Sequence, residues 1–123
     1  MASFEMRTIS EFHYSTVFLD GKAFGSDEQL HDELAFKLGL PEGYGRNFDA
    51  LLDCLSTIND PRRNLCTHWD LHAGQRMVLQ VKGLSDETTM SESLLKQFVQ
   101  TIATANERLS RSRGDVKIWV EFV

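Results

Sequence analysis

The chain has 123 residues and a formal net charge of −5, so it fits a single domain, and its acidity argues against non-specific nucleic-acid binding, which needs a basic surface. Two cysteines are too few to indicate a disulfide framework. Residues 1–12 are too mixed in polarity for a secretory signal, and no stretch approaches the roughly 18 apolar residues that span a bilayer. We therefore expect a cytoplasmic protein with no membrane or direct nucleic-acid binding, in its simplest form a monomer, whose charge suits a basic protein partner.

A strand and a helix come first in the predicted order of elements. Residues 15–20 are rich in β-branched and aromatic side chains, which favour a strand, and a glycine ends the run. In residues 26–38, Ser26 and Gln29 have the spacing of a capping box, and leucines recur at helical intervals. Gly39, with a proline two positions later, ends this predicted helix.

Residues 40–55 read LPEGYGRNFDALLDCL and predict a tight turn followed by a second helix. Asn47 is a helix N-cap residue, and the apolar spacing extends the helix to about Asn59. Five large apolar side chains are predicted to form its buried face: Phe48, Leu51, Leu52, Leu55 and Ile58. Asp49 and Asp53 lie one turn apart beside that face, where like charges repel by about 0.2–0.5 kcal/mol. A helix that keeps such a pair is a candidate for binding a positively charged partner.

Residues 60–75 show neither helical nor strand periodicity, which predicts a long connection of the kind that is often functional in a compact domain. Four potential metal ligands alternate along it and would share one side of an extended strand: Cys66, His68, Asp70 and His72. No second ligand cluster supports them, so we expect no metal and no cofactor. Nothing in the sequence supplies a third orienting group or an oxyanion hole for Cys66, so we expect no enzyme activity. A small metal-dependent enzyme built on this loop is the alternative.

The last third of the chain predicts a strand, a helix and a strand. Residues 77–81 form an apolar run typical of a buried strand. Thr89 and Glu92 have the spacing of a capping box for a helix that Gly114 ends, with Arg108, Arg111 and Arg113 near its C-terminus suiting the helix dipole. Its apolar face is predicted to comprise Leu94, Leu95, Phe98, Val99, Ile102, Ala105 and Leu109. Residues 115–123 alternate in polarity and predict the final strand.

This order of elements predicts an α/β fold, with a small, three-stranded, mostly parallel sheet packed with about three to four helices. Three strands make a narrow sheet, so its second face is expected to be partly open. Trp119 falls on that face, and its cover could come from residues 1–14 or from the long loop, which contributes Trp69.

Residues 40–55 resemble the signature of the barstar family of intracellular ribonuclease inhibitors, which typically reads L-P-x-Y-Y-G-x-N-L-D-A-L-W-D-C-L. The resemblance extends outward to VFLDGKAF at residues 17–24 and SESLL at residues 91–95. It implies a short N-terminal extension, residues 1–15, and one barstar-like domain, residues 16–123, whose loop at about residues 60–75 is longer than usual.

In that family the helix and the loop before it plug the active site of a ribonuclease, and their carboxylates pair with its Arg, Lys and His side chains. The resemblance implies that Asp49 and Asp53 are the central acidic contacts and that Glu92 is a peripheral one. It also assigns Tyr44 and Gly45 to the inhibitory loop and Asn47 to the start of the helix. The predicted function is therefore an immunity protein against a basic ribonuclease that is secreted or delivered.

Three positions depart from the family pattern, and two of them, Gly43 and Arg46, add to the predicted partner-binding residues. Gly43 replaces an aromatic residue, Leu52 replaces a tryptophan, and Arg46 puts a positive charge in the acidic region. These changes leave open a barstar-fold binding module for a different toxin or regulatory protein.

Simpler structural roles also remain open for several of the predicted partner-binding residues. The helix N-terminus stabilises Asp49, a capping box explains Glu92, and Tyr44 could be a packing residue.

Overall fold

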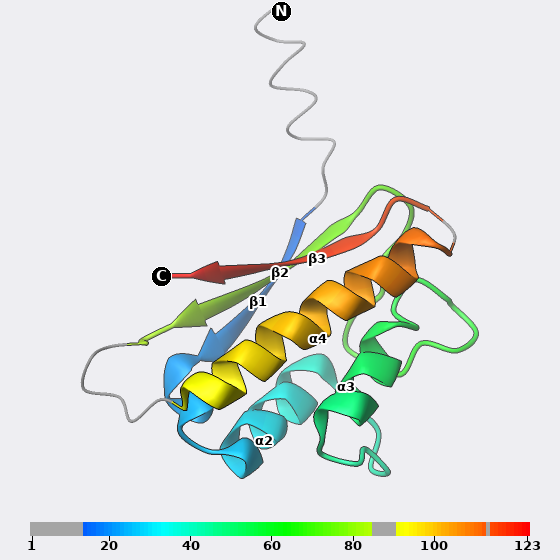
Figure 1. The fold of residues 1–123 in the computed structure, drawn as a ribbon. Helices are drawn as coiled ribbons and strands as arrows, with labels where there is room; N and C mark the ends of the chain where they lie inside the picture. Colours follow the sequence, from blue (N-terminus) through cyan, green and yellow to red (C-terminus); the bar gives the residue numbers. More distant parts are fainter. Residues whose placement is uncertain (1–13, 85–90, 113) are drawn as a thin grey trace, which may run out of the picture.

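The computed structural model describes residues 14–84, 91–112 and 114–123, and it confirms the predicted α/β fold (Figure 1). A parallel sheet with strand order β1-β2-β3 packs one face against the helices. In chain order the elements are β1 (Tyr14–Asp20), the 3-10 helix η1 (Gly21–Gly25), α2 (Asp27–Leu38), α3 (Phe48–Leu55), β2 (Arg76–Lys82), α4 (Glu92–Ser110) and β3 (Lys117–Phe122). Within the described ranges, no helix is long and apolar enough to cross a membrane.

The helix α2 begins and ends as the sequence predicts. The side chain of Ser26 accepts a hydrogen bond from the Gln29 backbone N–H at 3.1 Å, which satisfies one of the free donors of the first turn. Gly39 ends the helix in the left-handed conformation, with φ of 68°.

The helix α3 is shorter than predicted, because it ends at Leu55 and not near Asn59. The hydroxyl groups of Ser56 and Thr57 donate to helix carbonyls at 2.6 and 2.8 Å, and the backbone N–H groups of Thr57 and Ile58 bond three residues back. These bonds tighten the chain into turns, so the apolar spacing continues while the helix does not. Ile58 nevertheless stays buried.

The helix α4 corrects two details of the prediction. Its N-cap is Ser91, whose side chain accepts from the Leu94 backbone N–H at 3.2 Å; Thr89, the predicted cap, lies outside the described residues. The predicted apolar face is buried or half-buried except for Val99, whose surface is 42% exposed. The apolar stripe is therefore wider than the surface that covers it.

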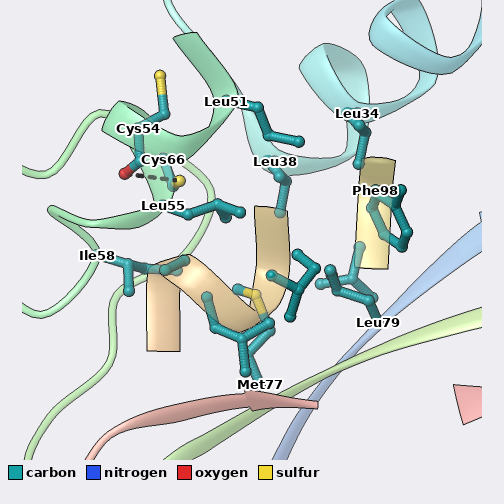
Figure 2. Close-up of a cluster of buried hydrophobic side chains, with 14 of the residues drawn as sticks. Leu34, Leu38, Leu51, Cys54, Leu55, Ile58, Cys66, Met77, Leu79 and Phe98 are labelled. Atoms are coloured by element: carbon teal, nitrogen blue, oxygen red, sulfur yellow. Dashed lines mark hydrogen bonds between the residues drawn. The ribbon is translucent and has the colours of Figure 1, made fainter. Parts of the chain in front are cut away.

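The core lies between the helices and one face of the sheet. Figure 2 shows side chains from α2, α3, β2 and α4 that point toward one another, namely Leu34, Leu38, Leu51, Leu55, Met77, Leu79 and Phe98, all fully buried. Each such side chain contributes about 1.5–3 kcal/mol by leaving water. The long loop also joins this core, because it buries Cys66 and Leu71.

The second face of the sheet is partly open, as predicted, with Phe18 50% and Trp119 40% exposed. Tyr14 supplies cover, since its ring centroid lies 5.6 Å from that of Trp119. The loop tryptophan packs elsewhere: Trp69 Nε1 donates to the carbonyl of Lys37 at the end of α2, at 2.8 Å. Of the two alternatives for this cover, the loop tryptophan does not supply it and Tyr14, the last of residues 1–14, does; residues 1–13 lie outside the described ranges.

Candidate partner-binding site

The loop before α3 places the predicted acidic helix through one side chain. Asn47 Oδ1 accepts from the Ala50 backbone N–H at 2.7 Å, and its Nδ2 donates to the Gly45 carbonyl at 3.2 Å. The amide thus caps the helix and holds the end of the loop at the same time, which confirms the predicted N-cap. A side chain at Gly45 would crowd this arrangement, because its Cβ would lie 3.1 Å from Asn47 Nδ2.

Tyr44 is buried and anchors the loop to α2, which favours the packing role over direct contact. Its hydroxyl lies 2.5 Å from Nδ1 of His31, a fully buried side chain. Burial lowers the pKa of His31 and raises that of the Tyr44 hydroxyl, so both groups are neutral. The other ring nitrogen, Nε2, lies 3.4 Å from the carboxylate of Asp27. At that distance Nε2 has no hydrogen-bond partner among the described residues, but a proton on Nε2 faces the carboxylate, and in this tautomer Nδ1 accepts from the tyrosine hydroxyl.

Sequence reasoning missed His31, although its position one turn after Asp27 and between two buried leucines is a readable signal. It acts on the predicted site through Tyr44 and through Phe48 of α3, whose ring centroid lies 4.9 Å from that of the imidazole, so it is a positioning residue.

The two aspartates of α3 are both exposed, and their surroundings differ. Asp49 makes no hydrogen bond or ion pair with any residue that the structure describes, and it lies in the first turn, where the helix N-terminus favours negative charge. Asp53, one turn later, forms an ion pair with Arg108 of α4, with 3.2 Å between Oδ1 and Nη1. Beside them, Phe48 and Leu52 are only half-buried, so part of the predicted apolar face remains accessible.

Glu92 is the first residue of α4, exposed, and not part of the predicted capping box because Ser91 is the N-cap. The helices α3 and α4 lie side by side (Figure 1), and a groove between them is lined by Phe48, Asp49, Leu52, Gln97, Gln100, Thr101 and Thr104. Glu92 precedes the groove residue Gln97 by five positions, about 7.5 Å along the helix axis. Along α4, Glu92 thus lies before the residues that line this groove.

Two loop residues that depart from the family pattern, Gly43 and Arg46, differ in their surroundings. A Cβ at Gly43 would meet nothing within 4 Å, so the position of the family's aromatic residue is open to solvent. Arg46 has a left-handed backbone, with φ of 55°, and its Nη2 pairs with Asp32 of α2 at 2.7 Å. The positive charge of Arg46 is therefore balanced by α2.

A hollow of about 450 Å³ adjoins Asp53 at the other end of α3. It is lined by the end of α3, the start of the long loop and the last turns of α4, through Asp53, Ser56, Thr57, Asn59, Asp60, Pro61, Arg63, Leu65, Arg108 and Ser112. The sequence assigned Arg108 only to the helix dipole. No local pattern could have paired it with Asp53, because 55 positions separate the two.

The four potential metal ligands of the long loop do not share one side of a strand. Within the described part of the chain, no three His, Cys, Asp or Glu side chains are grouped to hold a metal. The Cys66 thiol is buried and donates to the Cys54 carbonyl at 3.6 Å (Figure 2), and burial raises its pKa to about 12. His72 instead pairs at the surface with Asp70, at 3.2 Å. A protonated, buried thiol is neither a nucleophile nor a metal ligand.

Comparison with known proteins decides the family. A family model described as "Barstar (barnase inhibitor)" matches residues 14–122, from the first residue of β1 to the last of β3. The chain belongs to the barstar family. It is also similar to a Bacillus subtilis (strain 168) protein named "Putative ribonuclease inhibitor YrdF", with 52% identity over 106 residues that cover 85% of this chain and 97% of that protein. The resemblance of residues 40–55 to the barstar signature is thus confirmed, and in this member of the family the signature forms the loop and the helix α3.

Proposed function

We propose that this chain inhibits a basic ribonuclease by binding over its active site, without chemistry of its own. Asp53 is the deepest contact, Asp49 its companion and Glu92 a peripheral carboxylate. The surrounding loop contributes the remaining predicted partner-binding residues, Gly43, Gly45, Arg46 and Asn47, and buried Tyr44 holds this loop in place. The barstar family and the ribonuclease inhibitor named among its relatives both support this proposal.

The observation that carries the proposal is a pair of exposed carboxylates on a capped helix. Asp49 and Asp53 lie one turn apart on α3, and the bond of 2.7 Å from Ala50 N to Asn47 Oδ1 fixes its first turn. Carboxylates on a rigid element lose little freedom on binding, which favours affinity. A negative surface also speeds encounter with a cationic active site.

An inhibitor of this kind protects the cell that makes the ribonuclease. We therefore propose that the protein is an immunity protein that acts in the cytoplasm as a monomer, against an enzyme that is secreted or delivered to competitors. Occlusion needs neither a metal nor a catalytic residue, and the surface aspartates serve only as partners in ion pairs.

A capture experiment tests the proposal. Wild type and the Asp49→Ala/Asp53→Ala variant are used side by side to bind proteins from the source organism, and captured proteins are identified by mass spectrometry and assayed for ribonuclease activity. We expect a basic ribonuclease on wild type only, inhibited when wild type is added back. Capture of a ribonuclease by both proteins alike would contradict the placement of the binding face.

Single substitutions locate the deepest contact. Truncating one member of a buried, hydrogen-bonded charge pair costs about 2–5 kcal/mol, a range to which the barnase–barstar complex itself contributed. Asp53→Ala should therefore weaken inhibition far more than Asp60→Ala, since the side chain of Asp60 accepts from the backbone N–H of Arg62 at 3.0 Å in a turn beyond the helix. Equal, small effects of both substitutions would refute this assignment.

A second candidate function is a binding module for a different toxin or regulatory protein. The open surface at Gly43 and the two arginines in or beside the acidic region, Arg46 and Arg108, favour it. In the capture experiment, a partner without ribonuclease activity that is lost with the double variant would select this candidate.

A further inference from the structure

The predicted deepest contact is an ion pair and not a lone carboxylate. Arg108 Nη1 lies 3.2 Å from Asp53 Oδ1, and the two side chains are 47% and 72% exposed. The pair forms only because α3 and α4 pack side by side (Figure 1). A partner that approaches Asp53 therefore meets a guanidinium at the same place.

The surface beside this pair is concave and carries charges of both signs. Asp60 and Arg63 of the long loop line the hollow of about 450 Å³ together with Asp53 and Arg108. Asp49, in contrast, faces a groove whose other lining side chains are uncharged. Along α3 the surface thus changes from purely acidic at Asp49 to mixed at Asp53.

The positive charge of Arg108 persists in any complex. An exposed ion pair contributes little to folding, so a partner can separate it easily. The guanidinium is not deprotonated in proteins, however. A cation that binds Asp53 then comes close to Arg108, and like charges at such a separation disfavour binding. A carboxylate placed beside that cation turns the repulsion into attraction.

We propose that Arg108 is a specificity-determining residue, which selects ribonucleases that place a carboxylate beside the cation that meets Asp53 and rejects those that present cations alone. The inference rests on the proposed function and deepens it by naming the charge arrangement of the partner. Rejection of wrong partners through repulsion is a general source of specificity. The two charges of this chain then meet two opposite charges of the partner.

Arg111 provides a matched control on the same helix. Its Nη2 pairs with Glu107 Oε1 at 2.7 Å, and its side chain is 74% exposed. Exchange of either arginine for glutamine removes one positive charge and keeps most of the aliphatic stem. Of these two arginines, Arg108 pairs with Asp53 and Arg111 does not, so an effect of net charge alone should be the same at both positions. Arg108→Lys keeps the positive charge but lacks the planar guanidinium, so it distinguishes an effect of the charge from an effect of the side-chain shape.

The test measures inhibition constants of wild type, Arg108→Gln, Arg108→Lys and Arg111→Gln against the ribonuclease captured by wild type. We expect Arg108→Gln to inhibit this enzyme about tenfold less tightly than wild type does. The other two variants should stay within about twofold of wild type. Equal urea midpoints for all four proteins would exclude a loss of folding.

Two results overturn the inference: Arg108→Gln inhibits the captured enzyme as tightly as wild type does, or inhibits it more tightly. The proposed function has a separate criterion, because it stands or falls with inhibition of a captured ribonuclease by wild type.

Discussion

Exchange of Tyr44 for phenylalanine removes one buried oxygen and leaves His31 Nδ1 without its partner 2.5 Å away. The ring remains, so no large cavity forms, and the cost comes from the buried nitrogen that water cannot reach. An unsatisfied buried group of this kind costs about 1–3 kcal/mol. For a domain of this size about 4 °C of melting temperature corresponds to 1 kcal/mol, so we expect a decrease of about 4–12 °C.

The measurements are thermal unfolding and urea unfolding at pH 7.5, both followed by tryptophan fluorescence, for wild type, Tyr44→Phe and Tyr14→Phe. Tyr14 is a matched control because its side chain is 48% exposed and its hydroxyl bonds to no residue within the described ranges. Tyr14→Phe should change the free energy of unfolding by less than about 0.5 kcal/mol. If Tyr44→Phe is no more destabilising than Tyr14→Phe, the bond to His31 does not anchor the loop.

Two further predictions concern pH and the turn after α2. Burial lowers the pKa of His31 from 6.5, so below that pH the unfolded chain binds a proton at this side chain more readily than the folded chain does. The contribution of His31 to the free energy of unfolding should therefore be constant above pH 6.5 and fall below it. In urea titrations at pH 5.5 and 7.5, His31→Gln should lose this part of the pH dependence. Gly39→Ala should be destabilising by more than about 1 kcal/mol, because φ is 68° and the new Cβ would lie 2.5 Å from Thr67 Oγ1. Gly43→Ala should change the same unfolding midpoint little, and similar losses for both glycines would contradict this reasoning.

Features that depend on a few neighbouring residues could be predicted from the sequence. Ser26 and Asn47 cap their helices as expected, because a free backbone N–H is satisfied by a side chain within three positions. Gly39 ends α2 because glycine readily adopts φ of 68°, with its own N–H bonded to the Ala35 carbonyl. The exposure of Asp49 and Asp53 also followed from local spacing, since Leu51 and Leu55 fix the buried side of α3.

Two kinds of feature could not be predicted in this way: those for which side chains compete with the backbone for hydrogen bonds, and those that depend on the surface of another element. The end of α3 was predicted too late, because apolar spacing does not reveal that the hydroxyls of Ser56 and Thr57 bond to helix carbonyls. Val99 was assigned to the buried face of α4, but burial there depends on how far the covering surface extends.

The sequence by itself determined the order of elements, the helix caps and an exposed acidic pair, together with the family signature that contains it. Only the tertiary structure decided what surrounds that pair: Arg108 beside Asp53, Arg46 drawn to Asp32, and Tyr44 anchored on His31. The physical reason is distance along the chain. Caps and spacing act within one or two helical turns, whereas these contacts join different elements and exist only once α2, α3 and α4 have packed on the sheet.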